Sequence, residues 1–211
     1  DVPNNPVVTA NVLITDTNCT IFIDSKKLRQ DVKEVLEADG IEVKEYEETT
    51  ATLEKLPTDA VMLYDDQRIN YALDEAIPTA VKRIAKTDVT TTLKAIKNDV
   101  EIENFKACEL RDGVAMVRFI KWLKEEVASG NITEIAAEQK LEDFRREQAD
   151  FVEPSFDTIA AYKENAAMMH YKAEEATQKT LEAQGLFLVD SGGQYYDGTT
   201  DITRTITLGA L

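Results

Sequence analysis

The chain has 211 residues, of which 40 are acidic and 24 are lysine or arginine, so its formal net charge is −16. A field of that sign repels nucleic acids and anionic lipid surfaces, and we therefore expect neither a nucleic-acid partner nor a membrane partner. No apolar run approaches the roughly 20 residues that a membrane span requires.

Residues 1–92 alternate between β-rich and helical segments. Strands are expected where β-branched residues concentrate, at 7–14, 19–23, 41–46, 60–64 and 81–85. Helices are expected where apolar residues recur at helical spacing, at 26–39, 50–56 and 69–76. A turn signal at 16–18 suits a hairpin between the first two strands, and Gly40 suits the end of the first helix. The alternation predicts a mixed α/β domain with a central sheet.

After residue 92 the pattern changes to two long helices. The first is expected over 97–128, and a Ser-Gly-Asn break at 129–131 ends it. Its inward stripe is predicted to consist of Ile102, Phe105, Cys108, Ala115, Phe119, Trp122 and Val127. Thr133 is a candidate N-cap for the second helix, which is expected to reach about residue 148 with Ala137, Leu141 and Phe144 inward. We therefore predict two domains, 1–92 and 93–211.

The cysteines indicate a reducing compartment. Cys19 and Cys108 are the only two, and they lie far apart in the sequence, so they form no disulfide framework. We expect a cytoplasmic protein in which both are small buried thiols. The acidic run at 45–48 is expected to be a solvated surface rather than a ligand set.

The residues that carry chemical information lie at 185–209. An apolar run at 186–189 predicts a buried strand that ends on Asp190. Glycine-rich bends follow, and the alternation at 199–208 predicts a second strand folded back on the first, with Asp201 at its start. A carboxylate at a core position is costly unless it is paired, hydrogen-bonded or bound to a metal, so Asp190 and Asp201 are candidates to share a cation.

On spacing alone, a second interpretation stays open. Aspartate at the end of a strand is common turn chemistry, as at Asp197-Gly198. The segment is not an EF-hand, because Gly192 and Gln194 stand where that loop needs oxygen ligands. Within the bends, Gly192, Gly193 and Gly198 are expected to supply backbone freedom.

The string DSGGQYYDGTTDITRT, residues 190–205, resembles the metal-binding hairpin of aminopeptidase P, the Xaa-Pro aminopeptidase branch of the pita-bread metallopeptidases. The segments at 93–123 and 144–171 also resemble the catalytic domain of that family. The resemblance implies a fold of the α/β (α+β) class. Residues 1–92 would form a mixed-sheet, creatinase N-terminal-like middle domain with flanking helices, and residues 93–211 the first half of a pita-bread catalytic domain.

This resemblance implies a metal-dependent exopeptidase that releases the N-terminal residue from peptides with proline in the second position. Asp190 would ligate one metal of a dinuclear centre and Asp201 would bridge both, with a metal-bridging hydroxide as the attacking group. Carboxylate-rich ligation suits Mn²⁺, with Zn²⁺ or Co²⁺ as alternatives. The family supplies a further histidine and two glutamates downstream of the hairpin, so residues 1–211 alone are expected to be inactive. A homodimer is expected for the full-length protein.

His170 is the only histidine in the chain. A histidine with a satisfied ring in the core or at the surface is one interpretation of it. By resemblance it would instead be catalytic, facing the substrate without ligating metal and stabilising charge that develops during attack. The preceding loop departs from the family at Lys163-Glu164, where many relatives have Gly-Pro. Thr199, Thr200 and Thr203 would hydrogen-bond the ligating carboxylates, and Arg204 would be structural.

A different class of function is a non-catalytic module that binds peptides or proteins on the same fold. Some relatives of this fold have lost metal and use the fold to hold peptides or proteins, and creatinase is a further relative that catalyses without metal. Retention of both Asp190 and Asp201 argues for the metallopeptidase. Metal analysis of the full-length protein distinguishes the two classes.

Overall fold

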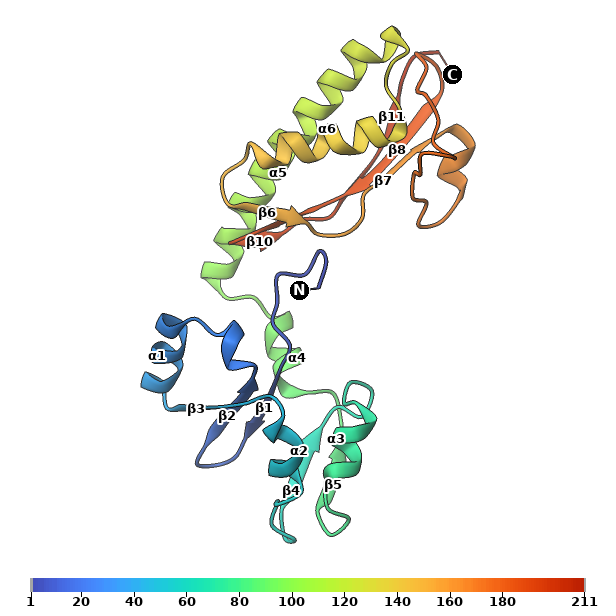
Figure 1. Ribbon diagram of the computed structural model, residues 1–211. Helices are drawn as coiled ribbons and strands as arrows, with labels where there is room; N and C mark the ends of the chain where they lie inside the picture. Colours follow the sequence, from blue (N-terminus) through green and yellow to red (C-terminus); the bar gives the residue numbers. More distant parts are fainter. Residues whose placement is uncertain (1, 211) are drawn as a thin grey trace. The chain divides into compact units, whose positions relative to one another are not determined.

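The structure is a computed structural model that describes residues 2–210 (Figure 1). It contains two compact units: Val7–Lys97, and Asn98–Leu211 together with Asp1–Pro6. The assignment of domains to 1–92 and 93–211 stays a prediction. Within residues 2–210, no helix is both long and apolar enough to cross a bilayer.

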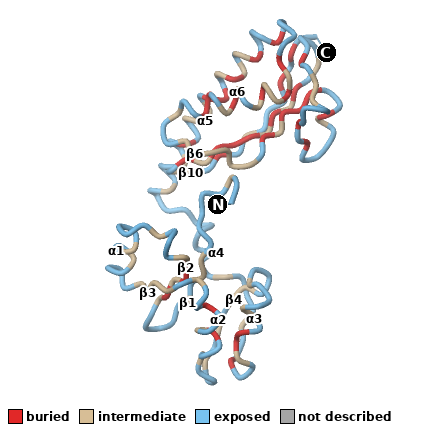
Figure 2. The backbone as a smooth tube through the Cα atoms, viewed as in Figure 1, coloured by how far each residue is buried: buried red, intermediate tan, exposed pale blue. Residues whose placement is uncertain are grey.

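The unit Val7–Lys97 contains two small sheets where the sequence predicted one. β1 (Ala10–Ile14) and β2 (Cys19–Ile23) form the expected antiparallel hairpin, and β3 (Ile41–Lys44) pairs in parallel with β2. β4 (Val61–Tyr64) and β5 (Lys82–Ala85) form a separate parallel pair. The helices of this unit are α1 (Gln30–Ala38), α2 (Glu48–Leu53), α3 (Tyr71–Ala76) and α4 (Val89–Ala95). A small core of Leu53, Ala76, Ile77 and Val81 lies beside the second sheet, and most of the unit is exposed in Figure 2.

Local signals in this unit act largely as expected. Gly40 has φ +80° just after α1, the left-handed conformation that glycine adopts at a helix end. The helix itself begins at Gln30, because residues Ser25–Lys27 form a short 3₁₀ helix capped by Asp24. The glutamates of the run at 45–48 are exposed, as predicted.

In the unit that begins at Asn98, two helices cover one face of a three-stranded antiparallel sheet (Figure 1). The helices are α5 (Asp99–Glu126) and α6 (Glu134–Arg146). The sheet has the order β11-β8-β7, formed by Ile202–Thr207, Leu186–Ser191 and Ile159–Tyr162. Phe187 and Val189 of the central strand are fully buried against Phe119 and Leu141 of the helices. The core of the unit therefore lies between the sheet and the helix pair.

The helix boundaries follow their caps. Asn98 and Glu101 form a reciprocal capping box at the start of α5, and the Thr133 hydroxyl accepts from the Ala136 amide at the start of α6, as predicted. Between the helices, Gly130 has φ +71°. The break at 129–131 thus ends the first helix by a left-handed turn.

The inward stripe of α5 contains a residue that the sequence did not indicate. Cys108, Ala115, Phe119 and Val127 are buried as predicted, whereas Ile102 is exposed. Asp112 is 1% exposed and lies in the same stripe. An acidic residue on an apolar face conflicts with helical periodicity, and only a partner on another element explains it.

Four short strands were missed by the sequence analysis: β6 (Phe151–Pro154), β7, β9 (Gly193–Tyr195) and β10 (Gly198–Thr199). The order β10-β9-β6 makes a second small sheet beside the first. β9 and β10, with three and two residues, are too short to show alternation, and β6 and β7 each contain only one β-branched residue. The pairing of β8 with β11 was predicted and is confirmed.

The two cysteines differ in burial, so they should differ in reactivity. Cys108 is fully buried, and burial, with a smaller contribution from Asp197, raises its pKa to about 12. Cys19 is only half-buried, which corrects the expectation for that residue. A pKa about three units above the usual value lowers the thiolate population about 10³-fold. We expect a thiol reagent to modify Cys19 in the native chain and Cys108 only after unfolding, with Cys19→Ser as the control. Equal rates at both thiols would contradict this.

Candidate metal centre

The paired strands bring the two candidate carboxylates near each other, because Asp190 lies in β8 and Asp201 directly precedes β11. Asp190 in β8 lies opposite Thr203 in β11, and Asp201 lies two residues before Thr203. Residues that stand diagonally across an antiparallel pair have Cα atoms about 7–8 Å apart and point to the same side. The Asp190 and Asp201 carboxylates are therefore close enough to contribute to the same site.

Both carboxylates line a single cavity of about 470 Å³, and His170 lines it as well. The other side chains around it are Phe156, Asp157, Ile159, Tyr171 and Lys172. The structure thus brings together all three residues that the sequence singled out. Of the five others, Asp157 and Lys172 lie between or after strands too short to be predicted, and no local signal marked them.

Asp190 is half-buried, and its Oδ1 accepts a hydrogen bond of 2.7 Å from the Thr203 hydroxyl. This bond confirms Thr203 as a support for a candidate ligand. Thr200 instead bonds the Gly193 backbone, and Thr199 bonds Gln194, so the expectation for those two residues was wrong. Arg204 is exposed and donates to the Thr203 carbonyl.

The glycines of the bends are needed for close packing rather than for backbone freedom. Gly192, Gly193 and Gly198 do not have positive φ. A Cβ at Gly192 would lie 1.9 Å from the Thr200 carbonyl oxygen, and a Cβ at Gly193 would lie 2.8 Å from the Tyr195 ring. At Gly192 two backbone segments approach so closely that only glycine fits, whereas at Gly193 the limit is the packing of an aromatic ring.

A buried ion pair supports the end of β8 from the helix side. Arg145 of α6 and Asp112 of α5 are each 1% exposed, and the Arg145 guanidinium donates two hydrogen bonds to the Asp112 carboxylate, of 2.7 and 3.1 Å. Arg145 also donates to the hydroxyl of Ser191, the residue after Asp190, and the Tyr195 hydroxyl donates to Asp112. Burial and the Asp112 charge raise the pKa of Tyr195. These contacts join both helices to the strand that carries Asp190.

His170 lies at the cavity in a left-handed backbone conformation, with φ +54°. It is exposed, and the following residue, Tyr171, is buried. Lys163, seven positions earlier, has φ +52°, although a residue with a side chain rarely adopts that region. Lys163 therefore takes the backbone conformation that glycine favours.

The cavity carries more negative than positive charge. Three of its residues are carboxylates, Asp157, Asp190 and Asp201, and Lys172 pairs with Asp157 at 2.6 Å. That hydrogen bond lowers the pKa of Asp157 and raises that of Lys172. Asp201 makes no hydrogen bond or ion pair within residues 2–210. A cavity of this sign attracts cations.

The donor set fits part of a divalent metal centre. Carboxylate oxygens are the ligands that Mg²⁺ and Mn²⁺ prefer, and Asp190 and Asp201 both line this cavity. No cluster of three or more candidate ligands occurs in the described part of the chain. The described residues therefore offer two candidate ligands at this cavity.

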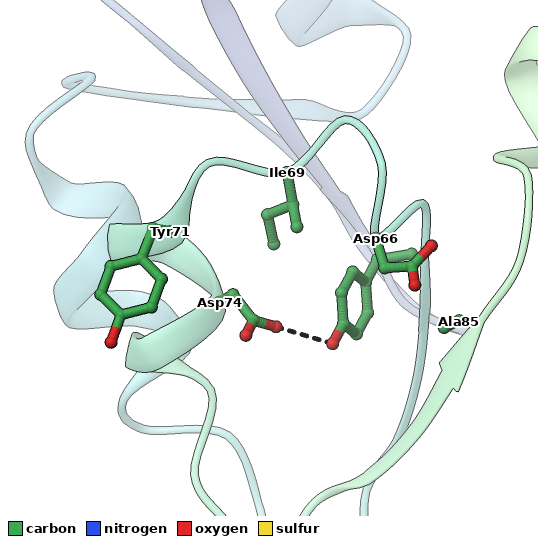
Figure 3. A pocket seen from close by; sticks show the side chains of 6 residues that line it. Asp66, Ile69, Tyr71, Asp74 and Ala85 are labelled. Carbon is green, nitrogen blue, oxygen red and sulfur yellow. Dashed lines mark hydrogen bonds between the residues drawn. The ribbon is translucent and has the colours of Figure 1, made fainter.

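A second cavity, of about 410 Å³, lies in the unit Val7–Lys97 (Figure 3). Asp66, Tyr71 and Asp74 are among its lining residues. The Asp74 carboxylate already accepts a 2.7 Å hydrogen bond from Tyr64 and pairs with Arg83. Its charge is compensated within the fold, and we assign no site to this cavity.

Family models match both parts of the chain. Residues 1–101 match the creatinase/prolidase N-terminal domain, and residues 103–211 match metallopeptidase family M24. Xaa-Pro aminopeptidase 1 of Dictyostelium discoideum is 37% identical over 99% of this chain and 34% of its own length. A probable Xaa-Pro aminopeptidase P of Sordaria macrospora is 34% identical over 99% of this chain and 36% of its own length. The chain thus spans about a third of the length of these relatives.

Solved structures give the same relationship. An X-prolyl aminopeptidase from Caenorhabditis elegans, described as a cytosolic enzyme with a di-nuclear active site, superposes with a TM-score of 0.89 at 32% identity. The match covers 99% of this chain and 35% of that protein. An X-Pro aminopeptidase from Thermotoga maritima, at 22% identity and a TM-score of 0.67 over 94% of this chain and 55% of its own, shares the fold.

Proposed function

The chain belongs to metallopeptidase family M24, and on this premise we propose that the full-length protein is a Xaa-Pro aminopeptidase. It would remove the first residue from peptides that have proline in the second position. The observation that carries the proposal is the single cavity lined by Asp190, Asp201 and His170, in a chain whose relatives are named Xaa-Pro aminopeptidases.

Asp190 and Asp201 would hold two divalent cations, with Asp201 shared between them and Thr203 orienting Asp190. When bound, such a pair supplies Lewis acidity and lowers the pKa of bound water. Mn²⁺ suits the carboxylate oxygens, and metal analysis decides between it, Zn²⁺ and Co²⁺. Parts of the full-length protein outside residues 1–211 would complete the ligand set, so residues 1–211 alone would be inactive.

His170 would face the substrate rather than the metal. Its imidazole lies at the cavity on an exposed turn, where it can donate a hydrogen bond to the scissile region of a bound peptide. Charge that develops on the carbonyl oxygen during attack would be stabilised by such a donor. Phe156 and Ile159 give the same cavity an apolar wall that suits an uncharged part of the peptide.

The test is a paired measurement on the purified full-length protein: bound metal per chain, and hydrolysis of a Xaa-Pro peptide beside the matching Xaa-Ala peptide. We expect about two cations per chain and release of the first residue from the Xaa-Pro peptide. A protein that binds peptides but holds no metal and hydrolyses neither would instead be a non-catalytic binding module. The same preparation gives the oligomeric state, for which we propose a homodimer.

Replacing His170 should separate catalysis from metal binding. In the full-length protein we expect His170→Ala to lower turnover about 10²- to 10⁴-fold, the usual range for a positioned acid–base or charge-stabilising group. Bound metal should stay at the wild-type level. Loss of metal together with activity would show that His170 is a ligand, and unchanged turnover would show that it is a surface residue.

A further inference from the structure

The structure contains a buried carboxylate that the metal centre does not use. Glu134 is the first residue of α6, and it is fully buried. In the sequence it is only an acidic residue in the first turn of a helix, a position that needs no special explanation. Its partners all lie on one later segment of the chain, which contains His170.

Four groups of that segment donate hydrogen bonds to the Glu134 carboxylate. The Tyr162 amide donates at 2.6 Å, the Asn165 side-chain amide at 3.0 Å, the Tyr171 hydroxyl at 2.8 Å and the Lys179 amide at 2.9 Å. Asn165 also donates to the Tyr171 hydroxyl at 2.9 Å. Hydrogen bonds to an ionised acceptor are about twice as strong as neutral ones, so this carboxylate is a strong anchor.

The anchored residues flank the two strained positions of the segment. Lys163 and His170 both have positive φ. Tyr162 directly precedes Lys163, and Tyr171 directly follows His170. Non-glycine residues persist in that region only when the surrounding structure holds them there. Between these positions the chain forms only a short 3₁₀ helix, Lys163–Ala167, and a turn. The other contacts of the segment include exposed ion pairs, such as Lys163 with Glu182 and Lys172 with Asp157, whereas the Glu134 carboxylate is buried.

Tyr171 connects the anchor to the cavity directly. Its ring lines the cavity beside His170, and it packs with Ala161 and Ala173 in a small apolar cluster. Burial, followed by the hydrogen bond to Glu134, raises its pKa to about 12. The hydroxyl therefore stays protonated at neutral pH and remains a donor to Glu134.

We propose that Glu134 is a positioning residue: its buried carboxylate holds the segment 162–179 in the conformation that places His170 at the cavity. The placement follows from contacts within this chain, and its effect on catalysis rests on the proposed function. Glu134 acts through His170 and does not touch the substrate.

The first test measures the segment itself, by hydrogen exchange of the full-length protein. Glu134→Gln replaces one carboxylate oxygen with an NH₂ group, which cannot accept the hydrogen bonds that the segment donates. Peptides from 163–179 should therefore exchange at least about tenfold faster, while peptides from 186–207 keep their wild-type rate. Glu142→Gln on the same helix, which removes only the pair with Arg146, is the control and should change neither. Tyr171→Phe removes one donor and should give a smaller increase in the same segment.

Wild-type exchange of 163–179 in Glu134→Gln would overturn the proposal. An equal increase in 163–179 and 186–207 would also overturn it, because Glu134 would then stabilise the whole unit. If Glu134→Gln fails to fold, Tyr171→Phe decides alone: a selective increase in 163–179 supports the anchor, and none overturns it.

The second test measures catalysis in the full-length protein. The Glu134→Gln variant should keep its metal, and its turnover should fall toward that of His170→Ala. In the double variant, adding His170→Ala to Glu134→Gln should lower turnover by less than a further tenfold. If the fold-loss in turnover of the double variant equals the product of the two single losses, Glu134 does not act through His170. A wild-type protein without peptidase activity would instead defeat the proposed function, while the exchange result would still decide whether Glu134 holds the segment.

Discussion

Asp190→Asn and Asp201→Asn in the full-length protein are each expected to abolish Xaa-Pro hydrolysis, with losses of at least about 10³-fold. Each change replaces an anionic ligand with a neutral amide of the same shape. A cation that is lost takes several kcal/mol of transition-state stabilisation with it, and each 1.36 kcal/mol is a factor of about ten. The loss at Asp201 should be at least as severe, because this carboxylate is the one proposed to serve both cations.

Bound metal and turnover should be measured on the same purified preparation of each variant, so that loss of metal can be distinguished from loss of catalysis alone. Bound metal should fall with activity in both variants. Asp143→Asn, which makes the same change at an exposed position of α6, is the control and should keep metal and turnover. If both hairpin variants keep full metal and near-normal turnover, Asp190 and Asp201 are turn residues and the peptidase assignment fails.

The second large effect is expected in the buried ion pair of Asp112 and Arg145. Asp112→Asn preserves shape and leaves the Arg145 guanidinium buried without a counter-charge. Breaking such a pair by removing one partner costs about 3–5 kcal/mol of unfolding free energy. Urea unfolding of the 211-residue chain reports it through Trp122, the only tryptophan, which packs against the same core.

A surface pair between residues of the same two-helix region provides the comparison. Arg118 and Glu147 form an ion pair whose side chains are 42% and 55% exposed. Glu147→Gln should cost at most about 1 kcal/mol, since water screens the charges. A loss below that value for Asp112→Asn would contradict the structural role of the pair. Replacing both partners, as Asp112→Leu with Arg145→Met, should be less damaging than Asp112→Asn alone.

The buried pair also explains why one face of α5 differs from the prediction made from helical periodicity. Helical periodicity predicts apolar residues along that face, and Asp112 satisfies the rule only through Arg145, 33 positions later, and Tyr195, 83 positions later. A pattern read along one helix contains no information about partners on another element. The same limit applies to the four short strands, whose pairing partners alone make them strands.

Glu134 is the clearest example of what the sequence did not reveal. Its donors stand between 28 and 45 positions downstream, on a segment without regular periodicity. Nothing in that segment marks Tyr162, Asn165 or Lys179 as partners of a helix N-terminus. The charge of one buried carboxylate becomes informative only when the fold shows which groups surround it.

The sequence by itself determined the features whose causes are local. The turn at 16–18, the left-handed helix ends at Gly40 and Gly130, the Thr133 cap and the pairing of the strands at 186–189 and 202–208 each depend on a few consecutive residues. The resemblance of residues 190–205 singled out Asp190 and Asp201 as candidate ligands, which stay a prediction, and the match to metallopeptidase family M24 confirms the family. The tertiary structure alone decided that His170 joins them at one cavity, that Gly192 is needed for packing, and that Asp112 and Glu134 are buried. The physical reason is that burial, close approach and hydrogen-bond satisfaction depend on residues distant in sequence, which only the packed chain brings together.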